Sequence, residues 1–378
     1  MTVRKVLALT LGVLSALLCG AAPAAATSPA PPPPPPPLTG EHLGPDRLPR
    51  CADVVAAMSP RDRLAQRLMV GADAADPRAT ADDVRSAQVG GIFIGGNATA
   101  LLTDQALRGV QAMSRIPLAV AVDDEGGRVQ RIDTLDGELP SARAMARSRT
   151  PEQVRELGEE RGREQLARGI TMNLAPTVDV TGRSTAIGDR SFGDDPETVS
   201  SYAGAFAEGQ RAAGVYTVLK HFPGHGRADG DSHKGRVTTP ALVDMRSDDL
   251  RPYATLLGPG GALADGRTGV LVGHLDVPGL TTDLPSSLTP NVYALLRQEI
   301  GFDGLVLTDD LGAMDAITDE FTLPQAVQRA LEAGADMALW SGGDRITPVL
   351  DHLERAGLDP AANDTAVTRV LRAKRVCS

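Results

Sequence analysis

The hydrophobic and polar positions of the chain form a repeating pattern of short apolar segments separated by longer amphipathic ones. About eight segments are apolar throughout, which is typical of parallel strands covered by helices on both faces. Several of these segments lead directly into polar residues. The predicted strands, some with the loop that follows, cover residues 70–72, 89–97, 117–122, 172–180, 214–219, 269–273, 304–308 and 337–340.

Residues that favour helix starts precede several of the amphipathic segments. Ser59, Asp195 and Thr289 each stand directly before a proline, so each is a candidate cap with proline at the first helical position. Thr150 and Gln153 have the spacing of a capping box. The predicted helices start at these four caps, and others cover residues 101–113, 250–257 and the segment around 326–331.

This alternation of strands and helices predicts an α/β fold, a (β/α)₈ barrel of the TIM type, in a single domain over residues 49–378. The residues with the most reactive side chains follow predicted strands, as expected at the mouth of such a barrel. One or two helices fit after Trp340. A doubly wound open sheet is the alternative, but it needs a glycine-rich first turn that the sequence lacks.

Composition and charge narrow the class of protein. The chain has 378 residues, of which 42% are hydrophobic and 23% charged, as in ordinary globular proteins with a large core. The formal net charge is −10. An excess of acidic groups argues against nucleic acid as a partner, because phosphate binding requires basic side chains.

The first 48 residues have the features of an export signal and a linker. Arg4 and Lys5 precede an apolar run over 6–19 and the small residues 21–26, which predicts a signal peptide over 1–26. The apolar run is shorter than the roughly 20 residues of a membrane-spanning helix. A proline-rich linker follows at 27–48. We therefore expect a secreted or cell-wall-associated protein without a stable membrane span, or alternatively a lipoprotein anchored through Cys19.

Two cysteines, Cys51 and Cys377, remain in the predicted mature chain at the two ends of the domain. An even number of cysteines in an exported protein favours a disulfide. A closed barrel would bring the first and last elements together, so both features predict a Cys51–Cys377 bond. Two unpaired thiols are the alternative.

The most polar stretch of the chain is K-H-F-P-G-H-G-R-A-D-G-D-S-H-K at residues 220–234. It begins where a predicted strand ends. Asp231 and His233 are separated by one residue, so the carboxylate can orient the imidazole for proton transfer near neutral pH. A metal site and a purely structural loop are the alternatives, although the spacing matches neither H-E-x-x-H nor a C-x-x-C pair.

Two further acidic segments follow predicted strands. Asp309 and Asp310 come directly after the strand at 304–308, and D-D-E-G-G-R-V-Q-R occupies 123–131 after another strand. A carboxylate at a barrel mouth is suited to nucleophilic catalysis. The second segment fits either a salt-bridge network or a set of groups that bind hydroxyls.

Together these motifs resemble the family 3 glycoside hydrolases, in the β-N-acetylhexosaminidase branch. The resemblance extends from about residue 59 to 342 and includes I-G-D-R-S-F-G at 187–193. It implies that Asp309 is the nucleophile and His233 the acid/base, oriented by Asp231. It also implies a set of substrate-binding residues: Asp123, Arg131, Arg190, Lys220 and His221.

The sequence departs from the resembled family at a few positions. Asp124 replaces a commoner glutamine, and Arg227 and Ala228 replace residues that are commonly acidic and hydroxylic. Asp179, His274 and Trp340 follow or end strands, and we leave their roles open between packing and the pocket. Many relatives carry a second domain after the barrel, and we expect no equivalent of it in the residues that follow Trp340 here.

The resemblance implies an exported retaining exo-β-N-acetylglucosaminidase that needs no cofactor and no metal. We expect it to act as a monomer on terminal β-linked GlcNAc of peptidoglycan fragments, such as muropeptides, or of chitooligosaccharides. A β-glucosidase, a phosphorylase of the same family and a non-catalytic wall-binding barrel are the alternatives.

Overall fold

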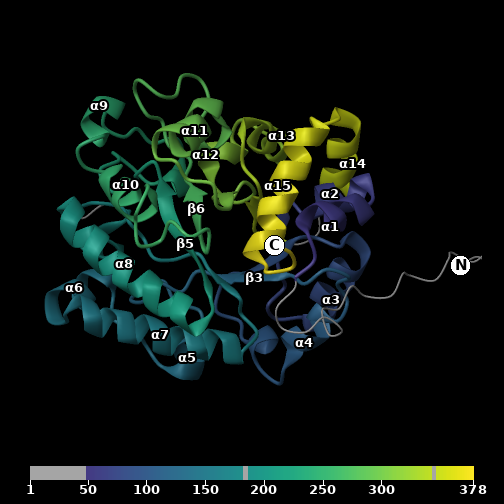
Figure 1. Ribbon diagram of the computed structural model, residues 1–378, viewed down its shortest axis with the longest axis horizontal. Coiled ribbons are helices and arrows are strands. Elements are labelled where there is room, and N and C mark those ends of the chain that lie inside the picture. Colours follow the sequence, from purple (N-terminus) through teal and green to yellow (C-terminus); the bar gives the residue numbers. More distant parts are fainter. Residues whose placement is uncertain (1–47, 182–185, 343–345) are drawn as a thin grey trace, which may run out of the picture. The chain divides into compact units, whose positions relative to one another are not determined.

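The computed structural model describes residues 48–181, 186–342 and 346–378. Residues 1–47, which include the predicted signal peptide, Cys19 and nearly all of the proline-rich linker, lie outside the described residues. The described residues belong to one compact unit, in which strands and helices alternate (Figure 1).

The centre of the domain is a sheet of eight parallel strands in the order β7-β6-β5-β4-β3-β2-β1-β8. A bridge between Leu307 and Met337 joins the two ends of this sheet, so the strands form the predicted (β/α)₈ barrel. The strands are β1 Leu68–Gly71, β2 Gly91–Ile94, β3 Ala119–Val122, β4 Met172–Asn173, β5 Tyr216–Phe222, β6 Thr268–Val272, β7 Val306–Thr308 and β8 Ala338–Trp340.

Helices surround the strands (Figure 1). The helices before β5 are α1 Cys51–Ala57, α2 Pro60–Ala65, α3 Pro77–Ala87, η2 Ala100–Leu102, α4 Ala106–Gln111, α5 Asp133–Asp136, α6 Ala142–Ser148, α7 Pro151–Ala167, η3 Gly188–Arg190 and α8 Pro196–Ala213. Those after β5 are η4 Ser232–Lys234, α9 Leu242–Met245, α10 Arg251–Leu257, η5 Ser286–Leu288, α11 Pro290–Ala294, η6 Leu295–Glu299, α12 Asp315–Thr318, α13 Leu323–Ala333, α14 Ile346–Ala356 and α15 Pro360–Ala373.

The capping predictions hold at most of the predicted helix starts. Thr150 and Gln153 form the capping box of α7, and the side chains of Ser59 and Asp195 accept hydrogen bonds from the first turns of α2 and α8. The Thr289 side chain, in contrast, makes no cap hydrogen bond and instead donates to the carbonyls of residues 284 and 285.

Two predicted elements were too long. The strand predicted over 172–180 pairs regularly only at Met172–Asn173, because Pro176 lacks the N–H that would continue the ladder. The helix predicted over 101–113 is divided into η2 and α4, since Asp104 and Gln105 between them have φ of 50° and 58°. Their backbone lies in the left-handed region, which an α-helix cannot include.

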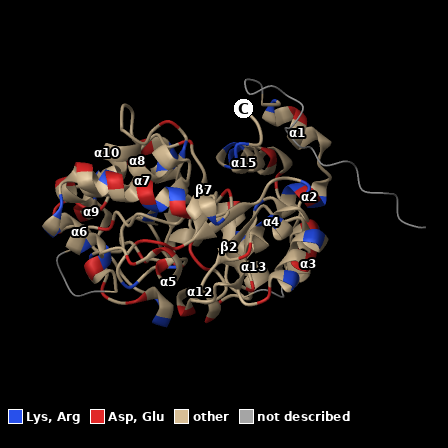
Figure 2. Ribbon diagram, turned by 90° about the horizontal axis from the view of Figure 1, so that it is seen from below, with Lys and Arg blue, Asp and Glu red and all other residues tan. Residues whose placement is uncertain are grey.

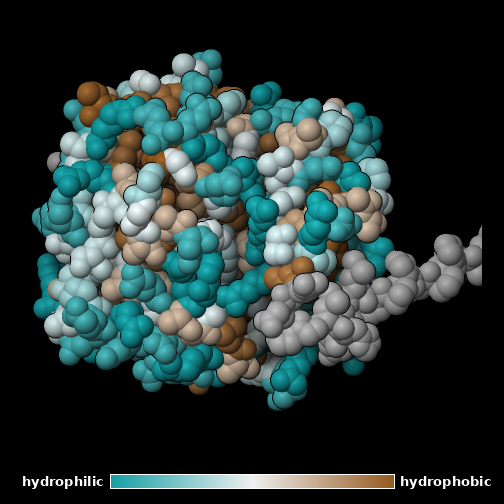
Figure 3. All heavy atoms as spheres, viewed as in Figure 1, coloured by the Kyte–Doolittle hydropathy of each residue, from teal (hydrophilic) through white to brown (hydrophobic). Residues whose placement is uncertain are grey.

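Apolar side chains fill the barrel and α15 closes one end of it. Val370 and Ala373 of α15 belong to the same buried cluster as Met172, Tyr216 and Met337 at the strands' amino-terminal ends. Figure 2 shows α15 and α12 on opposite sides of the barrel. Hydrophilic side chains cover most of the face that carries α15 (Figure 3). The amino-terminal end is thus plugged, which leaves the opposite end for a site.

The predicted disulfide is present. Cys51 and Cys377 are bonded, with Cα atoms 4.9 Å apart and a sequence separation of 326. Backbone hydrogen bonds from Ser378 to Pro49 and from Cys51 to Ser378 hold the same two chain ends together. The bond therefore closes a loop that contains nearly the whole domain.

Replacing both cysteines by serine is expected to lower the free energy of unfolding by about 2–5 kcal/mol, because the unfolded chain regains the entropy of an open loop. Urea denaturation measures the change. The reduced parent protein is the control and should match the Cys51→Ser/Cys377→Ser variant. Equal stability of oxidised parent and variant would contradict the prediction.

None of the helices in the described part of the chain is both long and apolar enough to cross a membrane.

Candidate active site

A pocket of about 540 Å³ opens at the carboxyl ends of the strands. All eight strands contribute to its wall, either at their last residues or in the loops directly after them, as is usual for sites in this fold. Seven of the eight predicted catalytic and substrate-binding residues line it, and only Asp231 does not. Those seven are Asp123, Arg131, Arg190, Lys220, His221, His233 and Asp309.

One wall of the pocket is a buried network of alternating charges. The Lys220 ammonium lies 2.5 Å from Asp123 and 2.7 Å from Glu125. Arg190 donates two hydrogen bonds of 2.7 Å to the two oxygens of Glu125. The network joins residues that follow β3 with residues of β5 and η3, and it places two cations and a carboxylate beside the pocket.

Glu125 is a member of this network that the sequence reasoning did not select. Its side chain is buried, and the burial raises its pKa, but the charges of Arg190 and Lys220 outweigh burial and hold the pKa well below the ordinary value. Glu125 is therefore ionised and fixes both cations. The D-D-E-G-G-R motif pointed to this group of acids, although nothing in the motif distinguished Glu125 from Asp123 and Asp124.

His221 is held from two sides. Its Nδ1 lies 2.7 Å from the carboxylate of Asp179, and its Nε2 lies 3.3 Å from Nη2 of Arg190. Asp179, whose role the sequence left open, is fully buried and lies behind the wall of the pocket. It is thus neither a rim contact nor a simple packing residue.

Asp309 follows β7 and lines the pocket. Burial raises its pKa, but the imidazoles of His221 and His274 and the ammonium of Lys220 outweigh burial, so its pKa lies below the ordinary value. One of its oxygens accepts a hydrogen bond of 2.9 Å from the Asp310 amide. The carboxyl group is therefore ionised at neutral pH, as a nucleophile requires.

Asp310 has a different task from its neighbour. Its carboxylate accepts hydrogen bonds from the amides of Gly312, at 2.8 Å, and Ser341, at 3.1 Å. These bonds connect the loop after β7 to the loop after β8. Of the two acids that follow this strand, Asp310 is thus bound to backbone groups, whereas Asp309 has a charge environment suited to chemistry.

Asp231 and His233 form the predicted pair. The Asp231 carboxylate lies 3.0 Å from Nδ1 of His233 and accepts a hydrogen bond of 3.1 Å from its amide. The His233 side chain is 67% exposed, yet it lines the pocket, with η4 beside α12. Its Nε2 is thus left for a ligand in the pocket.

Arg131 and Asp124, which are close in sequence, lie in different environments. Nε of Arg131 is buried without a partner among the described residues, and the side chain lines the pocket. Asp124 is buried away from it, with its carboxylate 2.9 Å from Arg161 of α7 and accepting from Gln165. The extra charge of Asp124 is therefore neutralised behind the site.

Two other residues that the sequence left open are structural. Trp340 is fully buried and does not line the pocket. His274 is buried, with Nδ1 2.7 Å from the Ser287 hydroxyl and Nε2 3.1 Å from the Asp310 carbonyl. It thereby supports the segment that carries Asp309.

Arg227 anchors the loop that carries Asp231 and His233. Its guanidinium lies 2.6 Å from the buried carboxylate of Asp249 and 3.2 Å from Asp248, in the segment just before α10. Burial raises the pKa of Asp249 to about 6, against the opposing effect of Arg227. Above this pH the carboxylate is charged and the pair is complete.

Replacing Arg227 by methionine is therefore expected to speed hydrogen exchange of amides in residues 224–238 by about tenfold, which corresponds to about 1.4 kcal/mol. The ratio of the exchange rate in the variant to that in the parent should be largest above pH 6. It should be smaller below this pH, where Asp249 is protonated in both proteins. Mass spectrometry measures it. The control is Arg246→Met, which removes an exposed ion pair with Glu299. Equal rates of amide exchange in the two variants would refute the role of Arg227 as an anchor of this loop.

Among the described residues, no group of three or more histidine, cysteine, aspartate or glutamate side chains is arranged to hold a metal ion.

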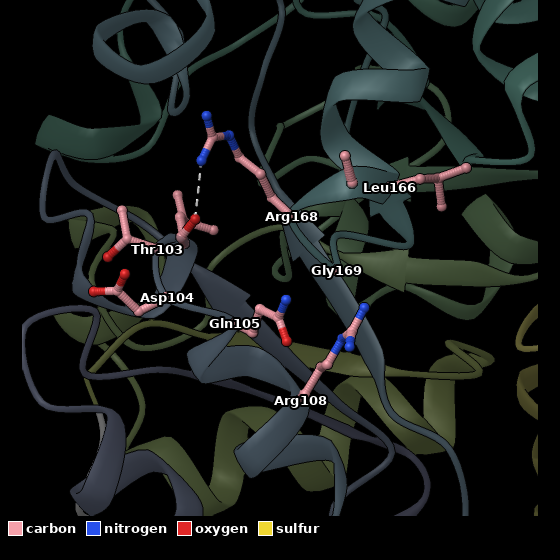
Figure 4. Close-up of a pocket in the computed structure, with 9 residues that line it drawn as sticks. Thr103, Asp104, Gln105, Arg108, Leu166, Arg168 and Gly169 are labelled. Carbon is pink, nitrogen blue, oxygen red and sulfur yellow. Dashed lines mark hydrogen bonds between the residues drawn. The ribbon is translucent and has the colours of Figure 1, made fainter.

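A second hollow, of about 360 Å³, lies between the segments 102–108 and 166–169 (Figure 4). Arg168 donates a hydrogen bond of 3.0 Å to the Leu102 carbonyl and pairs with Asp136. The side chains that line it include neither a nucleophile beside a base nor a paired acid. The pocket at the carboxyl ends of the strands is therefore the candidate active site.

Comparison with known proteins agrees with this geometry. The model of the glycosyl hydrolase family 3 N terminal domain matches residues 60–373. The β-hexosaminidase LpqI of Mycobacterium tuberculosis is 51% identical over 337 residues, which cover 85% of this chain and 84% of that protein. A β-hexosaminidase of Stenotrophomonas maltophilia is 32% identical over 261 residues, or 67% of this chain and 76% of that protein.

Solved structures give the same result. The structure of M. tuberculosis LpqI superimposes with a TM-score of 0.82 at 48% identity and covers 86% of this chain and 97% of that one. The β-N-acetylhexosaminidase of Beutenbergia cavernae has a TM-score of 0.76 at 31% identity, with 85% and 100% covered. This chain belongs to glycosyl hydrolase family 3.

Proposed function

We propose that the protein is an exported retaining exo-β-N-acetylglucosaminidase, a β-N-acetylhexosaminidase that removes terminal β-linked GlcNAc. The observation that carries the proposal is the arrangement of an ionised carboxylate, Asp309, and an aspartate–histidine pair, Asp231 and His233, on one pocket beside a network of hydrogen-bonding side chains. The printed names of its relatives, β-hexosaminidase and β-N-acetylhexosaminidase, support the same activity.

The sugar is held by the charged wall of the pocket. Sugar hydroxyls both donate and accept hydrogen bonds, so they need partners of both kinds. The proposed partners are Asp123 and the Nε2 lone pair of His221 as acceptors, and Lys220, Arg190 and the guanidinium of Arg131 as donors.

The first step joins the sugar to the enzyme. A carboxylate oxygen of Asp309 attacks the anomeric carbon, while protonated His233 donates the proton on Nε2 to the leaving glycosidic oxygen. The bond from the anomeric carbon to the leaving oxygen breaks as the ester to Asp309 forms. Asp231 stabilises the imidazolium through Nδ1 before the transfer.

The second step releases the sugar. Neutral His233 takes a proton from water, the water oxygen attacks the anomeric carbon, and the ester bond to Asp309 breaks. Each step inverts the anomeric carbon, so the product keeps the β configuration. A histidine in place of the usual carboxylic acid is the departure from the common pattern, and Asp231 supplies the negative charge that supports it.

The substrates we propose are GlcNAc-terminated fragments of peptidoglycan, such as GlcNAc–MurNAc units, or chitooligosaccharides. Export places the enzyme outside the cytoplasm, secreted, wall-associated or anchored through Cys19. The signal-like sequence of residues 1–26 supports this location. So does the Cys51–Cys377 disulfide, because disulfides persist in oxidising compartments.

The test uses the purified mature protein with p-nitrophenyl β-N-acetylglucosaminide and, separately, the matching glucoside, each with and without inorganic phosphate. We expect preferential release from the GlcNAc substrate without phosphate. Faster release from the glucoside would indicate a β-glucosidase, and release that depends on phosphate would indicate a phosphorylase. No release from either substrate would contradict the proposed function and leave a sugar-binding protein.

A further inference from the structure

Asp179 is a buried carboxylate directly behind the sugar-binding wall. It lies in the extended segment after β4, where Thr177 bridges to Lys220 of β5. Its side chain is 0% exposed. Because it does not line the pocket, any effect it has on a bound sugar passes through the residues that it contacts.

The Asp179 carboxylate accepts hydrogen bonds only from the K-H-F-P-G-H segment among the described residues. One oxygen lies 2.7 Å from Nδ1 of His221. The other accepts from the amide of His225 at 2.6 Å and, more weakly, from the amide of His221 at 3.4 Å. The same carboxylate therefore holds both a sugar-binding side chain and the start of the loop that leads to Asp231 and His233.

The partners of His221 determine where its proton resides. Arg190 can only donate hydrogen bonds, so Nε2 of His221, 3.3 Å from Nη2 of Arg190, has to present a lone pair. The proton of the neutral imidazole is then on Nδ1, where it is donated to Asp179. In this tautomer the pocket side of the ring is an acceptor.

We propose that Asp179 is a positioning residue that holds His221 as the Nδ1–H tautomer. The single lone pair of Nε2 then accepts a hydrogen bond from a hydroxyl of the bound sugar in place of the long contact of 3.3 Å with Arg190. The proposal rests on the proposed function and deepens it, since it assigns the state of one sugar-binding group. Asp179 acts through His221 and touches neither the sugar nor the reacting atoms.

An asparagine at position 179 cannot replace the carboxylate. If its oxygen faces the His225 amide, its NH₂ group faces Nδ1 of His221 and pushes the proton to Nε2, opposite Arg190. If it is turned the other way, its NH₂ group faces the His225 amide and two donors meet. Nearly equal in size to aspartate, asparagine thus tests the hydrogen-bonding pattern and not the volume.

The first measurement is made on the unmodified enzyme. Nitrogen-15 NMR of the histidine-labelled mature protein reports the tautomer of each ring, and His221→Gln identifies the His221 signals. We expect Nδ1–H for His221. Finding Nε2–H in the unmodified enzyme would overturn the proposal before any variant is made.

The second measurement is made on Asp179→Asn. We expect the His221 signals to leave the Nδ1–H pattern and kcat/KM for p-nitrophenyl β-N-acetylglucosaminide to fall by about 10²-fold, as for a misplaced binding group. The loss should appear in KM as well as kcat, because the hydrogen bond is present in the bound ground state. An unchanged tautomer, or a changed tautomer with unchanged kinetics, would overturn the proposal.

The matched control is Asp336→Asn, another buried aspartate, which pairs with Arg297 and Arg369. It accepts from the Val306 amide at the amino-terminal end of β7, away from the pocket. Its thermal stability should fall while the His221 tautomer and the kinetics stay unchanged. If Asp336→Asn changed the His221 tautomer and the kinetics as much as Asp179→Asn does, the effect would be a general one of losing a buried charge. That result would refute the positioning role of Asp179.

Failure of the proposed function gives a different pattern. If the unmodified enzyme hydrolyses neither substrate, the proposed activity fails. The Asp179 assignment is then decided by the NMR tautomer and by titration with GlcNAc, followed at the His221 signals. We expect Asp179→Asn to weaken GlcNAc binding by about 10²-fold. Unchanged GlcNAc affinity would overturn the assignment of Asp179 as a positioning residue.

Discussion

Asp309→Ala is expected to lower kcat for p-nitrophenyl β-N-acetylglucosaminide by on the order of 10⁴-fold or more, as loss of a covalent nucleophile commonly does. KM should change little by comparison, because the proposed sugar contacts belong to Asp123, Lys220 and Arg190. Steady-state kinetics of the mature protein measures both. The effect is the largest we predict, since the other carboxylates of the pocket are engaged, Asp310 with backbone amides and Asp123 with Lys220.

Asp310→Asn is the comparison for that variant. Its amide oxygen can still accept from Gly312 and Ser341, so the loops after β7 and β8 remain connected and the loss of kcat should be far smaller. Circular dichroism and thermal melting establish that both variants are folded. Equal losses in the two variants would contradict the assignment of Asp309 as the nucleophile.

His233→Ala is expected to have the second largest effect, and its size should depend on the leaving group. A glycosidic oxygen of a disaccharide needs a proton to leave, so its hydrolysis should slow by about 10²–10⁴-fold. Nitrophenolate leaves without one, so the first step with the nitrophenyl substrate should be slowed less. Comparing kcat/KM for the two substrates in variant and parent measures this difference.

The second step gives an independent check on His233. Because the variant lacks the base that activates water, the glycosyl ester should accumulate, and azide, which needs no base, should restore turnover. The expected product is the β-glycosyl azide of GlcNAc, identified by NMR. No response to azide, with the same loss for both leaving groups, would mean that His233 is not the acid/base.

Much of the fold was predictable because the barrel imposes a regular pattern on the sequence. The strands of such a barrel have to be apolar throughout, because one face packs against the surrounding helices and the other fills the interior, and this feature located all eight. The predicted ends of strands and helices were wrong where a local backbone feature determined the structure. Pro176 ends the regular pairing of β4. The left-handed backbone of Asp104 and Gln105 divides a predicted helix.

The site was predictable to the extent that its residues directly follow strands. Asp309 met that criterion, whereas Lys220 and His221, predicted to follow a strand that ends at residue 219, lie within β5, which continues to Phe222. The resemblance to the family added Arg190. Glu125 and Asp179 were not selected, because their significance lies in contacts with residues that are distant in the sequence, which no local pattern encodes. Glu125 meets Arg190 from 65 residues away, and Asp179 meets His221 from 42 residues away.

Two of the departures from the family pattern, Asp124 and Arg227, have physical explanations. Asp124, in place of the commoner glutamine, is paired with Arg161 of α7 and does not alter the charge of the pocket. Arg227 has its own carboxylate partners in Asp248 and Asp249. Both changes are therefore accompanied by a compensating charge that only the folded chain shows.

The central claim is that the reaction passes through an ester between the sugar and Asp309. A 5-fluoro-GlcNAc β-fluoride reacts in the first step and slows the second, so the ester should accumulate on the mature enzyme. We predict an intact mass increased by one fluorinated sugar residue and, after digestion, a single modified peptide with the sugar on Asp309. Turnover of the reagent without an adduct, or an adduct on any other residue, would contradict the account.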